Sequence, residues 1–352
     1  MNLLVFNLAT DADDPLLSFS SQWINRLAAR YDRIDVITMR AGRLITASNV
    51  YVHSVGKEKG YGEARRALEF YRLLSSLRRQ RPYAACFAHM MPLFALMGAP
   101  LLQGVPITLW YAHRQAHLIL RLATAVSTRA VTSVAPSFPI QTNKLRVVGQ
   151  GIDTEFFAPS TDAQPDISSS VPYIVHVARL MPIKHQATLI RALVDVSNAQ
   201  AVFVGDVPPG ADPNYRRDLE TLARDLGVAE RVTFAGNQPP EGVRDWNRKA
   251  ALAVNLSPIG LFDKAALEGM AVGVPTLVGS TAFDDVVRDD RLKIIDLDDH
   301  VVLAQRLNDL LALPASERHM LGMALRERVI EAHSLNHLIG QLVSVFNTGE
   351  SE

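Results

Sequence analysis

The sequence predicts an α/β protein made of two doubly wound domains. The chain has 352 residues, more than one hydrophobic core usually supports, and 48% of them are hydrophobic. Short runs rich in Val, Ile and Leu alternate with segments of helical period along most of its length. A polar stretch rich in turn-forming residues, 161–172, interrupts this alternation. We therefore expect one domain over residues 1–160, a linker over 161–172 and a second domain over 173–330.

The first domain is expected to contain a mostly parallel sheet. Continuous apolar runs such as residues 3–6 are typical of strands that helices cover on both faces. The apolar stretch 83–110 is as long as a membrane span, but His89 and several prolines interrupt it, so we expect a strand, a helix and a strand there. The strands of this domain are expected at residues 2–8, 34–38, 50–54, 84–88, 106–111, 130–134 and 145–149.

The same alternation returns after the expected linker. A helical pattern then dominates residues 301–346. The strands of the second domain are expected at residues 173–177, 201–205, 232–236, 252–256, 276–279 and 292–295. The second half of the chain is therefore expected to form another doubly wound domain, followed by helices.

The single cysteine and the start of the chain bear on its location. One cysteine, Cys86, excludes an internal disulfide and a cysteine-based metal cluster, and its apolar surroundings predict a buried, unreactive thiol. Residues 1–8 lack the positively charged segment that begins a secretory signal, and acidic residues follow them. We therefore expect a cytoplasmic protein.

The charges are distributed unevenly along the chain. Residues 1–150 contain 18 Lys and Arg against 8 Asp and Glu, whereas residues 151–352 contain 18 against 28. Much of the positive excess falls on an expected amphipathic helix within residues 57–81, a pattern typical of helices on anionic membranes and also of solvated helices packed on a sheet. Nucleic acid is not an expected partner, because the whole chain has a net charge of zero and the patch lacks interleaved aromatic residues.

Two cations follow the first strand expected in the second domain. Ligands of open α/β sheets bind at the carboxyl ends of the strands, where N–H groups of the next helices point at them. Arg179 and Lys184 lie at such an end, and Pro182 fixes the turn between them. Two cations so placed can bind one diphosphate; the alternative is that they are ordinary surface charges of a loop.

A second motif, a strand, a loop and a helix, covers residues 255–275. The expected helix carries Glu268, and Asp263 and Lys264 stand at its start. The N–H groups of such a helix start can hold a phosphate. The alternatives are a solvated helix carboxylate for Glu268 and an N-cap for Asp263.

In these segments the chain resembles the retaining glycosyltransferases of family 4, which have the GT-B fold of two Rossmann-like domains facing across a cleft. The resemblance implies that Arg179 and Lys184 neutralise the leaving diphosphate and that Glu268 binds the ribose of the donor. Ala178 and His185 replace two glycines of the family pattern.

The family also has a first glutamate eight positions before the second, where this chain has Gly260. Asp263 and Lys264 offer a charged pair that can take its place. Two turns in which a glycine follows a strand resemble those that approach the base or ribose. The donor-binding residues that the resemblance implies, besides the three above, are Gly205, Asp206, Gly236, Asn237, Gly260, Leu261, Phe262, Asp263 and Lys264.

The first domain resembles the family less closely. The segment 9–19 lacks the glycines that usually follow the first strand. Its Asp11 and Asp13 form a D-x-D pattern that binds metal in a different transferase fold, but we expect a turn cluster and no metal site. His113 follows a strand end that in the family presents a histidine to the donor sugar, so it joins Arg179, Lys184 and Glu268 as a catalytic candidate. The last helix, here 331–352, crosses back to the first domain in the family.

The resemblance implies transfer of a sugar from a nucleotide-diphosphate sugar, UDP- or GDP-linked, with retention of configuration and without metal or cofactor. The implied acceptor is a saccharide or a lipid-linked saccharide, and the basic first domain suggests peripheral contact with the inner face of a membrane. Three alternatives remain: a sugar-nucleotide epimerase of the same fold, a nucleotide-sugar-binding pseudoenzyme, and a two-domain solute-binding protein.

Overall fold

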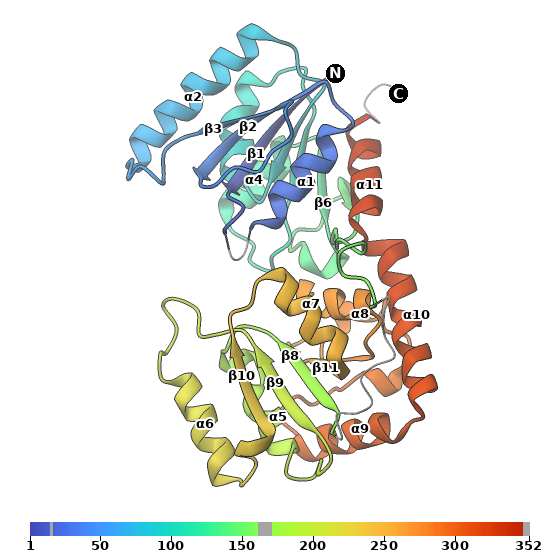
Figure 1. The fold of residues 1–352 in the computed structure, drawn as a ribbon. Helices are drawn as coiled ribbons and strands as arrows, with labels where there is room; N and C mark the ends of the chain where they lie inside the picture. Colours follow the sequence, from blue (N-terminus) through green and yellow to red (C-terminus); the bar gives the residue numbers. More distant parts are fainter. Residues whose placement is uncertain (15–16, 161–170, 348–352) are drawn as a thin grey trace. The chain divides into compact units, whose positions relative to one another are not determined.

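The computed structural model describes residues 1–14, 17–160 and 171–347, which form two compact units. The first unit consists of Met1–Gly151 together with Leu335–Glu352, and the second of Ile152–Ser334 (Figure 1). Each unit is a parallel sheet flanked by helices, so the predicted α/β class with two domains is confirmed. All but the last two residues of the expected linker, 161–172, lie outside the described residues.

The first unit contains a seven-stranded parallel sheet with the order β3-β2-β1-β4-β5-β6-β7. Its core strands are buried on both faces, since residues 3–6 of β1 have almost no exposed surface. The seven strands fall where the apolar runs predict them. Their bounds are β1 Asn2–Thr10, β2 Arg33–Ala41, β3 Val50–Ser54, β4 Ala85–His89, β5 Ile107–Trp110, β6 Arg129–Thr132 and β7 Leu145–Val147.

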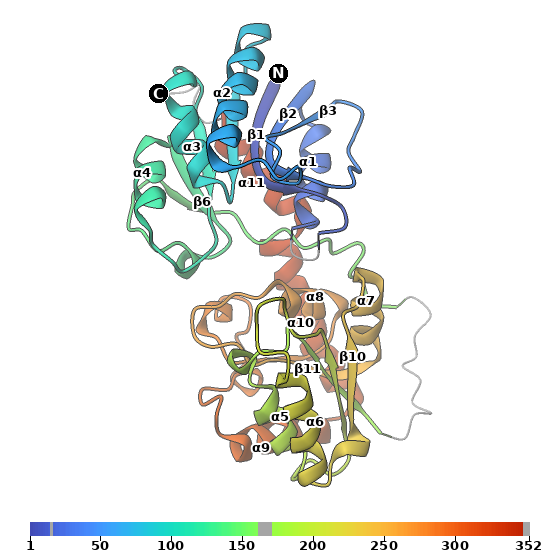
Figure 2. The same ribbon diagram turned by 90° about the vertical axis from the view of Figure 1, so that its left-hand side faces the viewer.

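Two helix layers cover this sheet (Figures 1 and 2). Helices α1 (Phe19–Ala28) and α11 (Leu335–Asn347) pack on one face, in a core shared with alternate residues of β1. The other face carries α2 (Glu63–Gln80), α3 (Pro92–Gly98) and α4 (Leu118–Val126). Short 3-10 turns follow α3, at Ala99–Leu101, and β6, at Ala135–Ser137. In the described part of the chain, no helix combines the length and apolar character needed to cross a membrane.

The second unit contains a five-stranded parallel sheet with the order β10-β9-β8-β11-β12. Its strands are β8 Tyr173–Val177, β9 Gln200–Val204, β10 Val232–Gly236, β11 Ala250–Asn255 and β12 Thr276–Val278. Its helices are α5 Gln186–Ala192, α6 Tyr215–Asp225, α7 Pro240–Lys249, α8 Lys264–Val272, α9 His300–Ala312 and α10 Ala315–His333. The expected strands other than 292–295 are confirmed, as is the helical pattern of 301–346.

The prediction of a strand at residues 292–295 is wrong. Asp289 accepts a hydrogen bond from the N–H of Arg291, which starts a 3-10 turn over Asp290–Leu292. After it only Lys293 forms a bridge to β12, and Ile295 is 92% exposed. A local side-chain cap thus replaces sheet pairing, and the apolar run is too short to oppose it.

The chain crosses between the units twice. It leaves the first unit after Gly151 and returns to it at Leu335, whereas the sequence analysis placed these changes at residues 160 and 331. Helix α11 packs on α1, and its apolar side chains belong to the core of the first unit. The last helix is therefore a part of the first unit.

In both sheets the strand order reverses beside the first strand of the unit. The reversal lies between β1 and β4 in the first sheet and between β8 and β11 in the second. Loops that leave two such neighbouring strands diverge to opposite faces, so ligands of open α/β sheets bind at this point. The second of these points holds most of the predicted site residues.

Candidate functional site

Lys184 and Asp263 meet where the strand order of the second sheet reverses. Lys184 ends the 3-10 turn that follows β8, and Asp263 lies in the loop after β11. The Nζ of Lys184 is 2.6 Å from Oδ2 of Asp263 and 2.9 Å from Oγ of Ser257. The lysine side chain is 8% exposed, so its charge is almost fully removed from water. We call Lys184, Asp263, Ser257 and Asn255 the lysine cluster.

The Asp263 carboxylate is held by every other member of the lysine cluster. Ser257 donates its hydroxyl proton to Oδ2, and the Asn255 amide donates to the same oxygen at 3.1 Å. Burial alone would raise the pKa of Asp263. The charge of Lys184 and these hydrogen bonds have the larger, opposite effect, so the pKa lies below its usual value. Asp263 is therefore ionised at neutral pH and forms an ion pair with the lysine.

Asp263 immediately precedes α8 but does not cap it. It occupies the N-cap position with extended backbone, and its side chain accepts no hydrogen bond from the first turn of the helix. The carboxylate is instead turned toward Lys184. The N-cap interpretation is therefore right for the position of Asp263 and wrong for its side chain.

Lys264 and Glu268 form a second ion pair, one turn apart on α8. Their Nζ and Oε1 atoms are 2.7 Å apart, and the Glu268 side chain is 11% exposed. The neighbours Asp263 and Lys264 were expected to act together in place of the missing glutamate. In the structure they engage different residues, because Asp263 binds Lys184 and Lys264 binds Glu268.

Arg179 differs from Lys184 in its surroundings. Its side chain is exposed at the end of β8, and its guanidinium makes no hydrogen bond or ion pair with the residues that the structure describes. Its backbone carbonyl accepts a hydrogen bond from Gln186 at 2.8 Å, which fixes the loop. Arg179 is thus a solvated cation at the same sheet edge as the buried Lys184.

The glycines after β9 and β10 bring the neighbouring loops together. Gly205 has a φ of +135°, and a Cβ there would lie 2.2 Å from the carbonyl oxygen of Ala178. Its N–H donates to the carbonyl of Gly236 at 2.8 Å. The Asp206 side chain accepts a hydrogen bond from the N–H of Val207 and pairs with Arg216 of α6, while Asn237 is exposed at the same edge. Only glycine allows this close approach of the β8 and β9 loops.

The segment before α8 explains why a glutamate is absent there. Gly260 has a φ of +84°, a conformation that glycine adopts readily and glutamate does not. Its N–H donates to the Ser280 hydroxyl at 3.0 Å. Leu261 continues this turn, and Phe262 packs on Phe283 with ring centroids 4.7 Å apart. The Phe262 side chain therefore fixes the loop by packing on Phe283, while the Phe262 backbone lies at the candidate site.

Three members of the site have no role predicted from the sequence. Asn255 and Ser257 are the polar residues that directly follow the apolar run of β11, and that position was the available signal. His176 on β8 is fully buried, and neither ring nitrogen has a hydrogen-bond partner in the described part of the chain. Burial, helped by the charge of Lys184, lowers the pKa of His176 to about 3. His176 is therefore neutral at physiological pH.

His113 belongs to the first unit and is described by itself. It lies in an exposed loop shortly after β5, and its Nδ1 accepts a hydrogen bond from the N–H of Gln115 at 3.2 Å. Its ring lies 6.3 Å from that of Tyr111. The hydrogen bond leaves Nε2 of His113 as the ring nitrogen that can reach a ligand.

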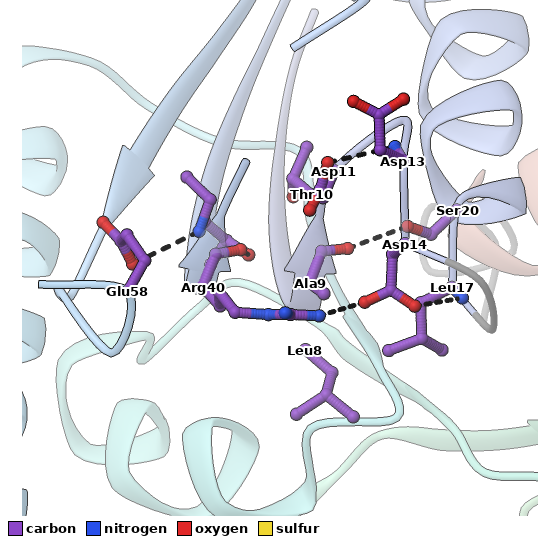
Figure 3. A network of polar contacts seen from close by, with 12 residues as sticks. Leu8, Ala9, Thr10, Asp11, Asp13, Asp14, Leu17, Ser20, Arg40 and Glu58 are labelled. Atoms are coloured by element: carbon purple, nitrogen blue, oxygen red, sulfur yellow. Dashed lines mark hydrogen bonds and ion pairs between the residues drawn. The ribbon is translucent and has the colours of Figure 1, made fainter. Parts of the chain in front are cut away.

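The aspartates after β1 form a network of polar contacts, and Figure 3 shows the Asp11–Asp13 hydrogen bond and the pairing of Asp14 with Arg40. Asp11 accepts a hydrogen bond from the N–H of Asp13, which pairs with Arg43 at 2.6 Å. Asp14 forms an ion pair with Arg40, which lies near the end of the neighbouring strand β2. Across the described residues, no group of His, Cys, Asp and Glu side chains is arranged to hold a metal ion. The D-x-D residues thus shape the loop.

His89 ends β4, at the reversal point of the first sheet. It is fully buried, with Nδ1 2.9 Å from Oδ1 of Asn7 and its ring beside Trp23. Burial lowers the pKa of His89 to about 3, so it is neutral and donates from Nδ1. His89 thus links β4 to β1 inside the first sheet.

Residues 171–312 match the sequence model of the family described as Glycosyl transferases group 1. D-inositol 3-phosphate glycosyltransferase of Acidothermus cellulolyticus is 30% identical over 169 residues, which make up 45% of this chain and 37% of that enzyme. The GDP-mannose-dependent alpha-(1-6)-phosphatidylinositol monomannoside mannosyltransferase of Mycolicibacterium smegmatis is 32% identical over 182 residues, 47% of this chain and 46% of that enzyme. The chain thus spans less than half the length of these curated relatives.

Solved structures extend the similarity to the whole fold. Anabaena HepE, solved in complex with UDP and glucose, superposes with a TM-score of 0.75 at 16% identity and covers 98% of this chain and 99% of its own. A glycosyltransferase from Rickettsia africae gives a TM-score of 0.76 at 12% identity, covering 98% of each chain. The resemblance to the group 1 glycosyl transferases is therefore confirmed for residues 171–312, in a chain whose two units have the GT-B fold.

Proposed function

We propose that the protein is a glycosyltransferase that moves a sugar from a nucleotide-diphosphate sugar to a saccharide or lipid-linked acceptor with retention of configuration. The proposal depends chiefly on one observation. In the unit that matches the group 1 family, Lys184, the exposed Arg179 and the start of α8 gather at the reversal point of the sheet. This combination suits a diphosphate at the place where α/β sheets bind ligands.

The chemistry of these groups fits the departure of a diphosphate. In sugar transfer, negative charge develops on the leaving phosphate while the anomeric carbon becomes cationic. The negative charge on the phosphate can be stabilised by Arg179, by the N–H of Lys184 that does not bind Asp263 or Ser257, and by the N-terminus of α8. The proposed mechanism therefore requires no metal. Glu268 is the proposed partner of the donor ribose hydroxyls. The ribose would replace Lys264, which pairs with Glu268 in the structure. His113 is the proposed contact to the donor sugar from the first unit.

The relatives guide the choice of substrates. One of them is named for its use of GDP-mannose, and HepE was solved with UDP, so we propose a GDP- or UDP-linked donor. The mannosyltransferase of Mycolicibacterium smegmatis is named for phosphatidylinositol monomannoside, and the glycosyltransferase of Acidothermus cellulolyticus for D-inositol 3-phosphate. Both acceptors are anionic, and we propose an acceptor of that class because the first unit carries the positive excess.

A peripheral attachment to the cytoplasmic face of a membrane is part of the proposal. The outer surface of α2 carries the exposed arginines Arg65 and Arg79. Helix α4 belongs to the same layer and exposes four apolar side chains, Leu118, Ile119, Leu122 and Val126. A basic surface beside exposed apolar residues is the combination that binds anionic lipid.

The decisive experiment is calorimetry of the protein with UDP, GDP, ADP and their sugar conjugates in the presence of EDTA. We expect micromolar binding of one nucleotide, and a loss of at least tenfold in affinity in Arg179→Ala and Glu268→Ala. Arg217→Ala, which removes an exposed arginine of α6, is the matched control and should bind like the wild type. Absence of binding to every nucleotide would contradict the proposal.

A nucleotide-sugar-binding protein without transferase activity is the second candidate. Gly260 supports it, because the glutamate that the family resemblance assigns to the donor sugar is missing and the backbone at that position disfavours it. Release of sugar from the bound donor, with or without an acceptor, separates the two. Binding without transfer or hydrolysis over a panel of anionic acceptors would favour the second candidate.

A further inference from the structure

Among the residues that the structure describes, Lys184 has one anionic partner, the carboxylate of Asp263. A buried ammonium needs a counter-ion, and Asp263 is that counter-ion at 2.6 Å. The hydroxyl of Ser257 accepts a second hydrogen bond from the ammonium at 2.9 Å. Two of the three donor protons are therefore used within the lysine cluster. One proton remains for a ligand, next to a carboxylate that already neutralises the charge.

The same carboxylate stands at the start of α8. Asp263 leaves the first turn of that helix uncapped, and its Oδ1 accepts no hydrogen bond from the residues that the structure describes. A phosphate that accepts a hydrogen bond from the remaining N–H of Lys184 and approaches this helix start would lie within about 4–6 Å of the carboxylate. At that distance the two negative charges repel each other strongly. Asp263 therefore opposes the anion that Lys184 attracts.

We propose that Asp263 is a built-in counter-ion that competes with the diphosphate for Lys184, weakens the binding of the nucleoside diphosphate product and so speeds its release. The inference rests on the proposed function, since it assigns Lys184 to the diphosphate. It assigns Asp263 a role opposite to that of an ordinary binding residue. Removal of its charge should tighten binding of the product, whereas removal of a residue that merely positions Lys184 should weaken it.

The test measures binding of UDP and GDP, by calorimetry in EDTA, to the wild type and to Asp263→Asn. Asparagine keeps the shape of the side chain and an oxygen for Lys184, so the charge is the main change. We expect the Kd for the recognised diphosphate to fall at least tenfold. The parent nucleoside, which carries no phosphate, should bind both forms within twofold. In turnover, kcat and the KM for the donor should fall together, because product release slows.

Two further variants serve as controls, one for folding and one for the loss of a negative charge elsewhere. Asp263→Ser also removes the charge and is a favoured helix-capping residue, so it provides a second neutral form if asparagine impairs folding. It should tighten binding as well, with folding of both variants checked by circular dichroism. Asp225→Asn removes an exposed carboxylate at the end of α6 and should leave the Kd within twofold of the wild type.

The outcomes separate the two proposals. If the wild type binds a diphosphate and the folded neutral variants bind it equally or more weakly, the counter-ion role is overturned and the proposed function stands. If no form binds any nucleotide, both fall. Tighter binding confined to the Asp263 variants supports the competition.

Discussion

His176 and His89 show how a single buried side chain sets the acid sensitivity of a domain. Both are fully buried, one in each sheet, and burial lowers the pKa of each to about 3. In the unfolded chain a histidine has a pKa of about 6.5. Between these values the unfolded chain binds a proton that the folded chain does not, so stability is complete above pH 6.5 and is lost as the pH falls toward 3.

His176→Leu should flatten this acid dependence for the second unit. At pH 5 the wild-type histidine costs about 2 kcal/mol of unfolding free energy relative to pH 7.5, and the variant lacks that term. Urea unfolding at the two pH values, followed by the fluorescence of Trp246 in the second unit, measures the difference. Equal pH dependence in the variant and the wild type would show that folding does not lower the pKa of His176.

The Lys184 and Asp263 pair also marks how far the sequence could predict the site. Both residues were assigned to the donor site from the motifs in which they occur. Their contact joins positions 79 apart in sequence and depends on β8 and β11 being neighbours, which motif spacing does not reveal. The inward turn of Phe262 and the positive φ of Gly260 were likewise invisible, since both arise from packing after the loop has closed.

At the scale of the element, α8 is positioned by a close contact with α10. Gly273 ends α8 in a left-handed conformation, and its carbonyl oxygen faces Gly322 of α10. A Cβ on Gly322 would lie 1.9 Å from that oxygen, well inside any allowed contact. The orientation of Glu268 and of the α8 start therefore depends on a glycine in a helix that contributes none of the predicted donor contacts.

Gly322→Ala should therefore destabilise the second unit by about 2 to 3 kcal/mol and weaken nucleotide binding, because the two helices must move apart. Gly340→Ala in α11 is the matched control: a Cβ there meets no atom within 4 Å. The control should be neutral or more stable by up to about 1 kcal/mol, since alanine favours helices. Thermal unfolding of both variants measures the contrast, and similar melting temperatures would refute the close contact.

Burial makes a central strand predictable from its sequence. Strand β8 is an apolar run between turn residues with three buried residues, and its bounds agree with the prediction to the residue. The segment 292–295 failed because it lies at the sheet edge, where the Asp289 cap outweighs a short apolar run. Edge segments have only one neighbouring strand, so local polar contacts have more influence on them.

At the scale of the whole molecule, the opposite charges of the two parts of the sequence bear on where the protein binds. Residues 1–150 carry a formal net charge of +10 and the remainder −10. Within the first unit, the buried Asp35 forms ion pairs with Arg33 and Arg81. The positive charges left at the surface include exposed arginines of α2, in the layer that also exposes the apolar side of α4.

Sedimentation with vesicles tests this surface. We expect the wild type to bind vesicles containing phosphatidylglycerol and not vesicles of phosphatidylcholine alone. Arg65→Glu with Arg79→Glu should lower the partition coefficient at least tenfold, because each cation near an anionic surface contributes about 1 kcal/mol. Leu118→Ser with Leu122→Ser should lower it independently of salt.

The control for the vesicle experiment reverses two exposed arginines of the second unit, Arg191→Glu with Arg217→Glu. This pair changes the net charge as much as the α2 variant does. If both pairs of substitutions reduce binding equally, the attraction depends on the total charge of the chain, and the proposed membrane surface is refuted.

Helix α11 gives the molecule a constraint on its synthesis. Its buried residues, among them Leu338 and Leu342, complete the core of a unit whose other residues end at Gly151. The second unit is one continuous segment, so its folding does not have to wait for α11. Until α11 is made, the face of the first sheet that α11 covers is protected only in part, by α1. Nascent chains are therefore vulnerable to aggregation through their earliest part, the reverse of the usual order in which the N-terminal domain is finished first.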